Sequence, residues 1–267
     1  WGDASIGCAE EGWITIDTAT SGYRKGGSGE VVGYSKPKRT YKAVELQIDR
    51  AWDEKWMFNA SYLWSRSDGN FEGPVNSDTG YGDTGMVQHW DHPAGNERYG
   101  VLFNDFRHQF KFRAAYALSE QWSFGTTLQV QSGGPITAFG VMWPNDTTAG
   151  GSTTSEGSGA GTGWLCTGTR EQCATLAGRE LVRTGRGAFG RLPWTWTMGA
   201  NVTWRLPVDG IDLSARLSVY NLFNNQTVVN VHQRYEAQPG VYREATFGTG
   251  TRWQAPRYAQ LVVTWNF

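Results

Sequence analysis

The chain has 267 residues, of which 39% are hydrophobic and 14% aromatic, and its 24 Lys and Arg nearly balance its 25 Asp and Glu, for a formal net charge of −1. No window approaches the roughly 18 consecutive apolar residues of a membrane helix, which excludes a helical membrane protein. The near-neutral charge also argues against a nucleic-acid-binding surface.

Glycine and aromatic residues are the two other features of the composition. The 35 glycines predict long loops and tight turns. The 14 Trp and 11 Tyr residues have amphipathic rings that favour a membrane interface, although an aromatic core in a soluble protein would use the same residues.

Residues 1–39 are polar and glycine-rich. We interpret them as an extracellular loop region in which the alternating run 13–20 forms an extended strand tip. The sequence starts at Trp1 without an initiator Met or a signal-peptide pattern, which indicates a mature product or a piece of a longer chain.

From residue 40 onward, apolar and polar residues alternate with the period of two that indicates β-strands. The expected strands are 41–52, 56–65, 106–118, 122–131, 194–205, 211–219 and 257–267. In the clearest of them, 106–118, an unbroken apolar row faces a row that carries Arg107, Lys111 and Arg113. Three cations on one face fit a wet lumen better than a sandwich core. A soluble sheet with this face in solvent is the alternative.

The connections between these strands alternate regularly in length. Short turns near residues 53, 119 and 208 alternate with long loops at 66–104, 132–192 and 221–256. Outer-membrane barrels place short turns on the periplasmic side and long loops outside. Because loops this long are uncommon in compact soluble domains, the sequence predicts an all-β fold, an antiparallel transmembrane β-barrel segment over residues 40–267. A soluble β-sandwich, whose strands also alternate, is the competing interpretation.

Aromatic residues gather near the expected strand ends, which predicts two interfacial girdles. Those near the short turns are Trp52, Trp56, Trp122, Trp204, Trp265 and Phe267. Those near the long loops are Tyr41, Tyr62, Trp64, Trp194 and Trp196.

Several segments resemble a known family. They are 39–48 (RTYKAVELQI), 60–66 with Gly69 and Asn70, 100–111 (GVLFNDFRHQFK), 221–226 (NLFNNQ) and 254–260 (QAPRYAQ) leading to the terminal Phe267. From about residue 39 to the end, the strands are similar to the closing strands of TonB-dependent outer-membrane receptors, in particular the Oar-like, OmpA-related group. The loops match poorly.

The resemblance implies a large barrel of 22 strands, of which this chain supplies about seven C-terminal ones, in the outer membrane of a Gram-negative bacterium. It implies an importer with an N-terminal plug that is driven by the TonB complex. The sequence shows neither a plug nor a TonB-binding segment, and about seven strands cannot close a barrel. We therefore expect the rest of the barrel and the plug to be partners, supplied by polypeptide outside this sequence.

Other partners that the resemblance implies are outer-membrane lipid, lipopolysaccharide, and surface lipoproteins or other surface proteins. No nucleic acid and no cofactor are expected. In the last strand, the resemblance implies a signal for the barrel-assembly machinery. Its residues are Tyr258, Leu261, Val263, Trp265 and Phe267.

Charged residues on the expected lumen face are candidates for ligand contacts. The cations are Arg107, Lys111, Arg113 and Arg216, and the carboxylates are Glu45 and Asp49. The cations either contact an acidic substrate, pair with these two carboxylates, or contact the plug.

Two of the three cysteines, Cys166 and Cys173, lie in the second long loop. In an oxidising exterior they are expected to form a small disulfide ring, with free thiols or metal ligands as the alternatives. Cys8 is left over, and we expect it to pair with a cysteine outside this sequence.

Metal, phosphate and catalytic motifs are weak or missing. The ligand types in the loop at His89, Asp91 and His92 lack further His or Cys nearby. Four oxygen-bearing residues miss the EF-hand spacing: Asp68, Asn70, Asp78 and Asp83. The glycine-rich run 157–163 lacks the Lys of a phosphate loop, and neither G-x-S-x-G nor H-E-x-x-H occurs.

The sequence therefore predicts a non-enzymatic transport function. A surface structural or adhesion barrel that moves nothing is the alternative. A soluble β-sandwich binding module is the third interpretation.

Overall fold

The computed structural model describes residues 14–17, 22–25, 31–33, 38–70, 99–140, 164–173, 180–208, 210–238 and 240–266. Several sequence predictions lie outside these residues. They concern Cys8, Asp78, Asp83, His89, Asp91, His92, residues 157–163 and Phe267.

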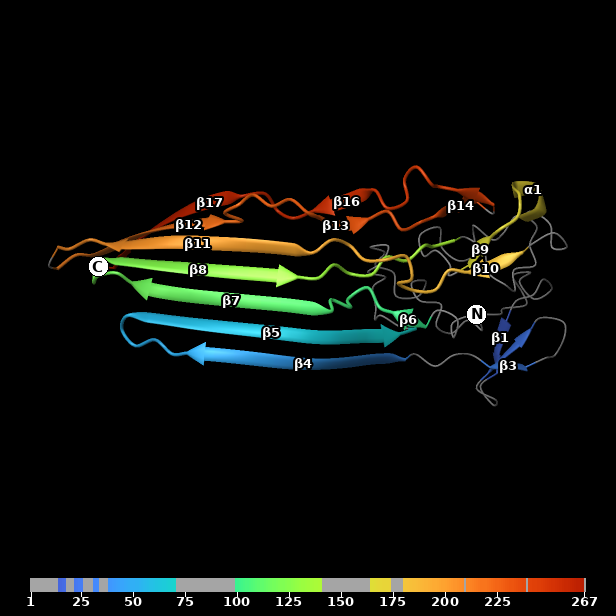
Figure 1. Ribbon diagram of the computed structural model, residues 1–267, viewed down its shortest axis with the longest axis horizontal. Helices are drawn as coiled ribbons and strands as arrows, with labels where there is room; N and C mark the ends of the chain where they lie inside the picture. Colours follow the sequence, from blue (N-terminus) through green and yellow to red (C-terminus); the bar gives the residue numbers. More distant parts are fainter. Residues whose placement is uncertain are drawn as a thin grey trace.

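Seven long antiparallel strands form one continuous sheet, with neighbours in the order β17-β12-β11-β8-β7-β5-β4 (Figure 1). They are β4 (Arg39–Arg50), β5 (Trp56–Gly69), β7 (His108–Ala117), β8 (Trp122–Gln131), β11 (Thr195–Arg205), β12 (Asp212–Tyr220) and β17 (Tyr258–Asn266). The short β6 (Gly100–Val101) pairs with the end of β5. Long strands that follow one another in the chain are neighbours in the sheet, so the connectivity is the simple up-and-down meander of a barrel wall. The predicted fold class is confirmed.

Short and long connections lie at opposite ends of this sheet. Figure 1 shows the connections 51–55, 118–121 and 206–211 at the end where β17 finishes, and the extended segments at the other end. The long strands have 9 to 14 residues, enough to cross a bilayer when tilted. We call these the short-turn end and the long-loop end.

Two strand boundaries differ from the sequence prediction. Strand β5 continues to Gly69, beyond the expected loop start at 66, because residues 66–69 pair with residues 39–42 of β4. Strand β7 starts at His108 rather than 106, since Phe106 donates its main-chain N–H to Asn104 in a turn and leaves the ladder.

The two faces of the sheet differ in polarity. Paired residues form rungs across the strands; one polar rung contains Asp49, Asn59, Arg113 and Thr127. The neighbouring rung, on the other face, contains Ile48, Ala60, Phe112, Leu128 and Met198. Because side chains alternate along every strand, these two compositions repeat over the length of the sheet.

The apolar face has no protein layer over it in the described part of the chain. Leu46, Ile48 and Leu261 are 64%, 65% and 67% exposed. The buried apolar residues lie instead at the long-loop end: Leu102, Ala138, Phe139, Leu192 and Val231. A sandwich would bury the apolar face of its sheet, so this arrangement is that of a membrane-spanning sheet whose apolar face meets lipid. No helix among the described residues is long and apolar enough to cross a membrane.

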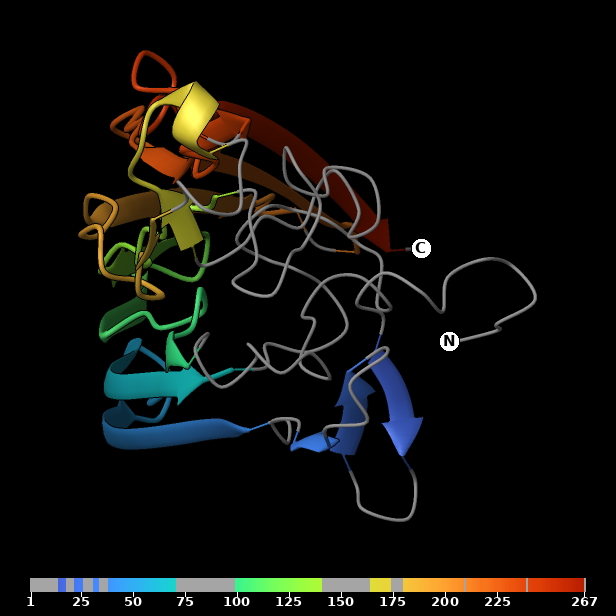
Figure 2. The ribbon, with the colours of Figure 1, turned by 90° about the vertical axis from the view of Figure 1, so that its right-hand side faces the viewer.

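The end-on view in Figure 2 shows that the sheet curves from β4 round to β17. Small sheets accompany it in the long-loop segments and in residues 1–39. The first comprises β1 (Ile14–Asp17), β2 (Gly22–Lys25) and β3 (Val31–Gly33). The others pair β9 (Trp164–Cys166) with β10 (Leu181–Arg183), β13 (Val228–Val231) with β16 (Gly250–Trp253), and β14 (Glu236–Gln238) with β15 (Val241–Tyr242). The single described helix is α1 (Arg170–Cys173).

Two of the aromatic residues expected in the girdles occupy other places. Tyr41 has the parity of Glu45, so the pleat puts it on the polar face. Trp52 follows the end of β4 and lines a hollow on that same face. At the other expected positions, Trp122 and Trp204 are paired across the sheet, and their ring centroids lie 6.3 Å apart.

Candidate functional site

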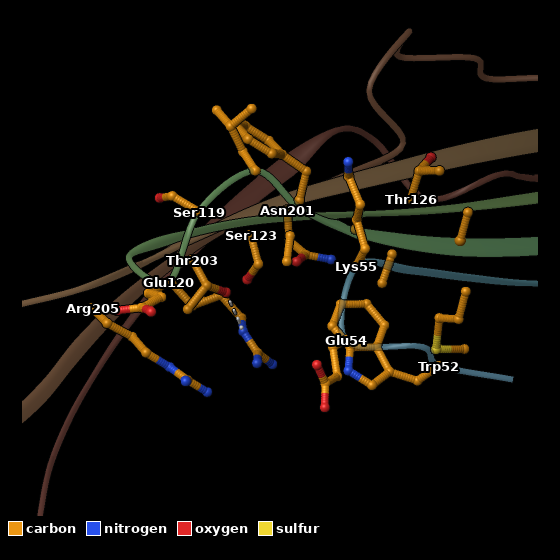
Figure 3. Close-up of a pocket in the computed structure, with 18 of the residues that line it drawn as sticks. Trp52, Glu54, Lys55, Ser119, Glu120, Ser123, Thr126, Asn201, Thr203 and Arg205 are labelled. Atoms are coloured by element: carbon orange, nitrogen blue, oxygen red, sulfur yellow. Dashed lines mark hydrogen bonds between the residues drawn. The ribbon is translucent and has the colours of Figure 1, made fainter.

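A hollow of about 1030 Å³ lies on the polar face, toward the short-turn end (Figure 3). Strands β5, β7, β8, β11 and β12 and the short turns supply its lining. Its cations are Lys55, Arg113, Arg205 and Arg216, and its carboxylates are Asp53, Glu54 and Glu120. The polar face is thus the concave side of the sheet.

The predicted lumen cations do not pair with the predicted carboxylates. Within the described part of the chain, Lys111, Arg113 and Arg216 form no ion pair. Asp49 accepts hydrogen bonds from the amides of Gln47, at 2.5 Å, and Asn59. The Nε of Arg216 donates to Thr203 Oγ1 at 3.1 Å.

On the polar face, strands β8 and β11 carry small or short polar residues between Arg113 of β7 and Arg216 of β12. A Cβ at Gly125 would lie 2.6 Å from Asn201 Nδ2, and one at Gly199 would lie 2.9 Å from Thr127 Oγ1. The two glycines therefore let neighbouring polar side chains lie flat on the sheet. The result is a shallow polar floor with a guanidinium group on each side, a geometry suited to an acidic group.

Arg107 has a different environment from the other predicted cations. Its Nε donates to Oδ2 of Asp105 at 2.8 Å, and Arg191 also pairs with this carboxylate. The Asp105 side chain is fully buried, and its Oδ1 accepts the main-chain N–H of Ser67 at 2.7 Å. Asp105 is therefore an anchor that joins β5, the start of β7 and the segment before β11. Sequence reasoning missed this anchor, although Asp105 lies in the quoted segment 100–111.

The segments 221–226 and 254–260 meet at the long-loop ends of β11, β12 and β17. The Nδ2 of Asn221 donates to the carbonyls of Asn225 and Ala255, both at 2.8 Å. The Nε2 of Gln254 donates to the carbonyl of Trp196 at 3.1 Å and to Thr197 Oγ1 at 3.0 Å. These two segments form a clasp that ties the long-loop ends of β11, β12 and β17 together.

Cys166 and Cys173 form the predicted disulfide, with their Cα atoms 6.0 Å apart. The buried carboxylate of Glu236 accepts the main-chain N–H of Cys166 at 3.4 Å and that of Gly240 at 2.8 Å. Tyr242 donates its hydroxyl to the Cys166 carbonyl. Burial, with a smaller contribution from Glu236, raises the pKa of Tyr242 above its usual value. The disulfide thus joins β9 to α1, and the hydrogen bonds of Glu236 and Tyr242 hold β9 against β14 and β15.

Two residues considered as metal ligands have other partners. Asp68 forms an ion pair with Arg66 at 2.6 Å, and Asn70 Oδ1 accepts the main-chain N–H of Lys38 at 2.7 Å. No group of three or more His, Cys, Asp or Glu able to hold a metal occurs within the described ranges.

The last strand, β17, presents its expected signal residues on both faces. Leu261, Val263 and Trp265 lie on the apolar face and are 61% to 67% exposed. Tyr258 lies on the polar face, where its ring stacks on Tyr220 with centroids 4.5 Å apart.

The chain is similar in sequence to a known transporter. The chain is 31% identical to the TonB-dependent transporter Oar of Myxococcus xanthus over 218 residues. This match covers 78% of the chain but 17% of the relative's length. No protein-family model matches the chain.

The chain also shows partial structural similarity to three solved structures. The ferric-catecholate import receptor Fiu of Escherichia coli gives a TM-score of 0.43 at 14% identity, over 95% of this chain and 23% of that one. The ferric citrate transporter FecA gives 0.40 at 14% identity, over 85% and 24%. The outer membrane transporter YddB of E. coli gives 0.45 at 12% identity, over 94% and 27%.

The curved meander, apolar outside and polar within, defines a section of the wall of a bacterial outer-membrane β-barrel. Over the matched residues its sequence is similar to that of the TonB-dependent transporter Oar. The chain belongs to the Oar-like TonB-dependent receptors.

Proposed function

We propose that this chain forms the C-terminal part of the barrel of a 22-stranded TonB-dependent transporter. Its long-loop end faces the exterior and its short-turn end the periplasm. The polar face lines the lumen beside a plug supplied by the rest of the parent protein. The chain contributes to substrate capture and energy-dependent uptake, and it makes and breaks no covalent bond.

Unpaired cations on the concave face are the observation that carries this proposal. Arg113 and Lys111 face inward and have no carboxylate partners in the described residues. Cations placed in this way do not stabilise the sheet, so a purely structural wall would not need them. If these side chains face a lumen, their positive charge is available to an acidic substrate or to the plug. The similarity to Oar supports the energy-dependent step, because that relative is a TonB-dependent transporter.

A binding experiment on the full-length parent protein tests the transport function. The receptor is purified from outer membranes in detergent and passed over the immobilised periplasmic domain of TonB. We expect saturable binding, and we expect deletion of the gene and deletion of the TonB gene to impair uptake of the same nutrient. A receptor that stays in the outer membrane but neither binds TonB nor changes any uptake would instead be a structural or adhesion barrel.

The contacts among the described residues of the long-loop end favour that second function if transport fails. The anchor at Asp105 and the disulfide of Cys166 and Cys173 cross-link segments at this end, where other proteins would bind. Capture of a specific surface protein by a receptor that does not bind TonB would support it.

A further inference from the structure

The apolar face of β4 carries charge only near its two ends. Val44, Leu46 and Ile48 separate Lys42 from Arg50. These two cations are eight residues apart, which is about 26 Å along the strand and about 20 Å along the barrel axis at the usual tilt. The apolar band of an outer-membrane barrel is about 25 Å tall. Lys42 therefore lies near the outer boundary of the band and Arg50 near the periplasmic one.

Three cations gather at that outer boundary, and we call Lys38, Lys42 and Arg66 the cationic corner. Lys42 and Arg66 are direct partners across β4 and β5, and Lys38 continues the same strand parity. The Nζ of Lys38 lies 5.7 Å from the centroid of the Tyr99 ring. One carboxylate, Asp68, takes the Nε and Nη2 of Arg66 at 2.6 and 3.1 Å. The corner keeps an excess of positive charge.

These side chains point away from the lumen. The neighbouring residues Ser65 and Ser67, which have the opposite parity, are 2% and 0% exposed beneath the outer segments, whereas the Arg66 side chain is 50% exposed. A further strand added beside β4 would extend the sheet without covering this face, because side chains stand perpendicular to the sheet.

Aromatic side chains lie one or two rungs nearer the membrane centre than the corner. Trp64 pairs with His108 in the register, and His108 Nδ1 shares a hydrogen bond of 2.7 Å with Tyr62 OH. Trp194 stacks on His108 with ring centroids 5.6 Å apart. Such a belt marks the level of the headgroups, so the cations just outside it meet the phosphates of the outer leaflet.

We propose that the cationic corner binds the phosphate groups of an outer-leaflet glycolipid headgroup. Lys42 makes no hydrogen bond or ion pair in the described part of the chain, so its ammonium group is available to a phosphate oxygen. Arg66 adds a guanidinium donor beside it, and the aromatic belt packs against the upper ends of the acyl chains. The inference rests on the proposed function for which end of the sheet faces outward.

Native mass spectrometry of the full-length receptor tests this proposal. The receptor in mild detergent is titrated with diphosphoryl lipid A, with its dephosphorylated form and with inorganic phosphate. We expect retention of the diphosphoryl lipid alone. Each near-surface cation strengthens binding roughly fivefold, so the double variant Lys42→Gln, Arg66→Gln should weaken retention roughly 25-fold. The matched control is Arg252→Gln, which removes one charge from the exposed strand β16 and should retain the lipid.

The folded state of each variant is checked by heat-modifiable gel mobility. Equal binding of both lipid forms, or full retention by the folded double variant, would overturn the proposal. The double variant should still bind TonB, because the corner faces away from the lumen. If the wild-type receptor holds the lipid through Lys42 and Arg66 but does not bind TonB, the transport function fails and the lipid site stands.

Discussion

Arg191 binds Asp105 across 86 residues of sequence. Its Nη1 donates to the main-chain carbonyl of Asp105 at 2.7 Å, and its Nη2 donates to the carboxylate. The same Nη1 also donates to the carbonyl of Gly133 at 3.1 Å. One guanidinium group thus fixes the segment before β11 onto the segments that flank β7 and β8, at the long-loop end of the sheet.

Replacing Asp105 with Ala should loosen the long-loop end. The change leaves Arg107 and Arg191 facing each other without their carboxylate, and the main-chain N–H of Ser67 without its acceptor. We expect a loss of about 2–4 kcal/mol in local stability, less than for a fully buried pair because both arginines are partly exposed. Limited proteolysis of the receptor should show faster cleavage within 180–192.

Glu120→Gln is the matched control for that experiment, because it also removes a carboxylate but from an exposed turn. Its cleavage rate should equal that of the wild type. An Asp105→Ala receptor with unchanged cleavage within 180–192 would show that the anchor contributes no stability.

Asn221 should prove sensitive to substitution for two separable reasons. Its φ is +49°, and its side chain makes three hydrogen bonds, to Asn225 through both main-chain groups and to Ala255. Asn221→Gly keeps the backbone conformation and loses the bonds, a cost of about 2–3 kcal/mol. Asn221→Ala adds about 1 kcal/mol for the left-handed backbone. Hydrogen exchange of 221–227 and 254–257 measures both, and equal exchange in wild type and the Gly variant would contradict the clasp.

Removing the disulfide should affect the outer surface and spare the wall. Cys166 and Cys173 are seven positions apart, and closing so short a loop contributes about 2–3 kcal/mol in the chain-entropy description. The double variant Cys166→Ser, Cys173→Ser should therefore be cleaved faster within 164–183. Its gel mobility before heating should remain that of a folded barrel, and a change in that mobility would mean that the wall depends on this loop.

The β4–β5 turn should weaken in acid. The main-chain N–H of Trp56 donates to Asp53 Oδ1 at 3.0 Å, and this bond, with smaller contributions from Arg50 and Lys55, holds the pKa of Asp53 below its ordinary value of 3.8. The stabilisation is present above the unfolded-state pKa and is lost as the pH falls through the lower folded-state value. Hydrogen exchange at Trp56, corrected for intrinsic rates, should accelerate in that window.

Asp53→Asn provides the comparison for the acid experiment. An amide oxygen still accepts from Trp56 but does not titrate, so the extra acceleration in acid should disappear. If the variant and the wild type respond equally to acid, another group is responsible.

The wall of the barrel could be predicted from the sequence because its signals are local. Every second residue along β7 is apolar from Phe110 to Tyr116, and that alternation by itself specifies a strand with one apolar and one polar face. The short turns sit between two such runs, so they too are visible in the sequence. The expectation that Tyr41 belongs to a lipid-facing girdle is not met, because Tyr41 shares the parity of Glu45 and lies on the polar face.

The partners of the charged residues required the tertiary structure. Arg107 shares the alternation of Lys111 and Arg113, yet it turns to Asp105 because the chain leaves the ladder at Phe106. Asp49 lies on the same rung as Arg113, but the amide of Asn59 stands between them.

The sequence alone determined that this protein is an antiparallel sheet with one polar and one apolar face, since side-chain alternation depends only on neighbours along the chain. That the apolar face meets lipid rather than a second sheet followed from its exposure in the structure. The tertiary structure decided which side chains hold the outer end together. Asp105 and Arg191, and Asn221 and Ala255, are separated by 86 and 34 residues, and such contacts exist only once distant segments are brought side by side.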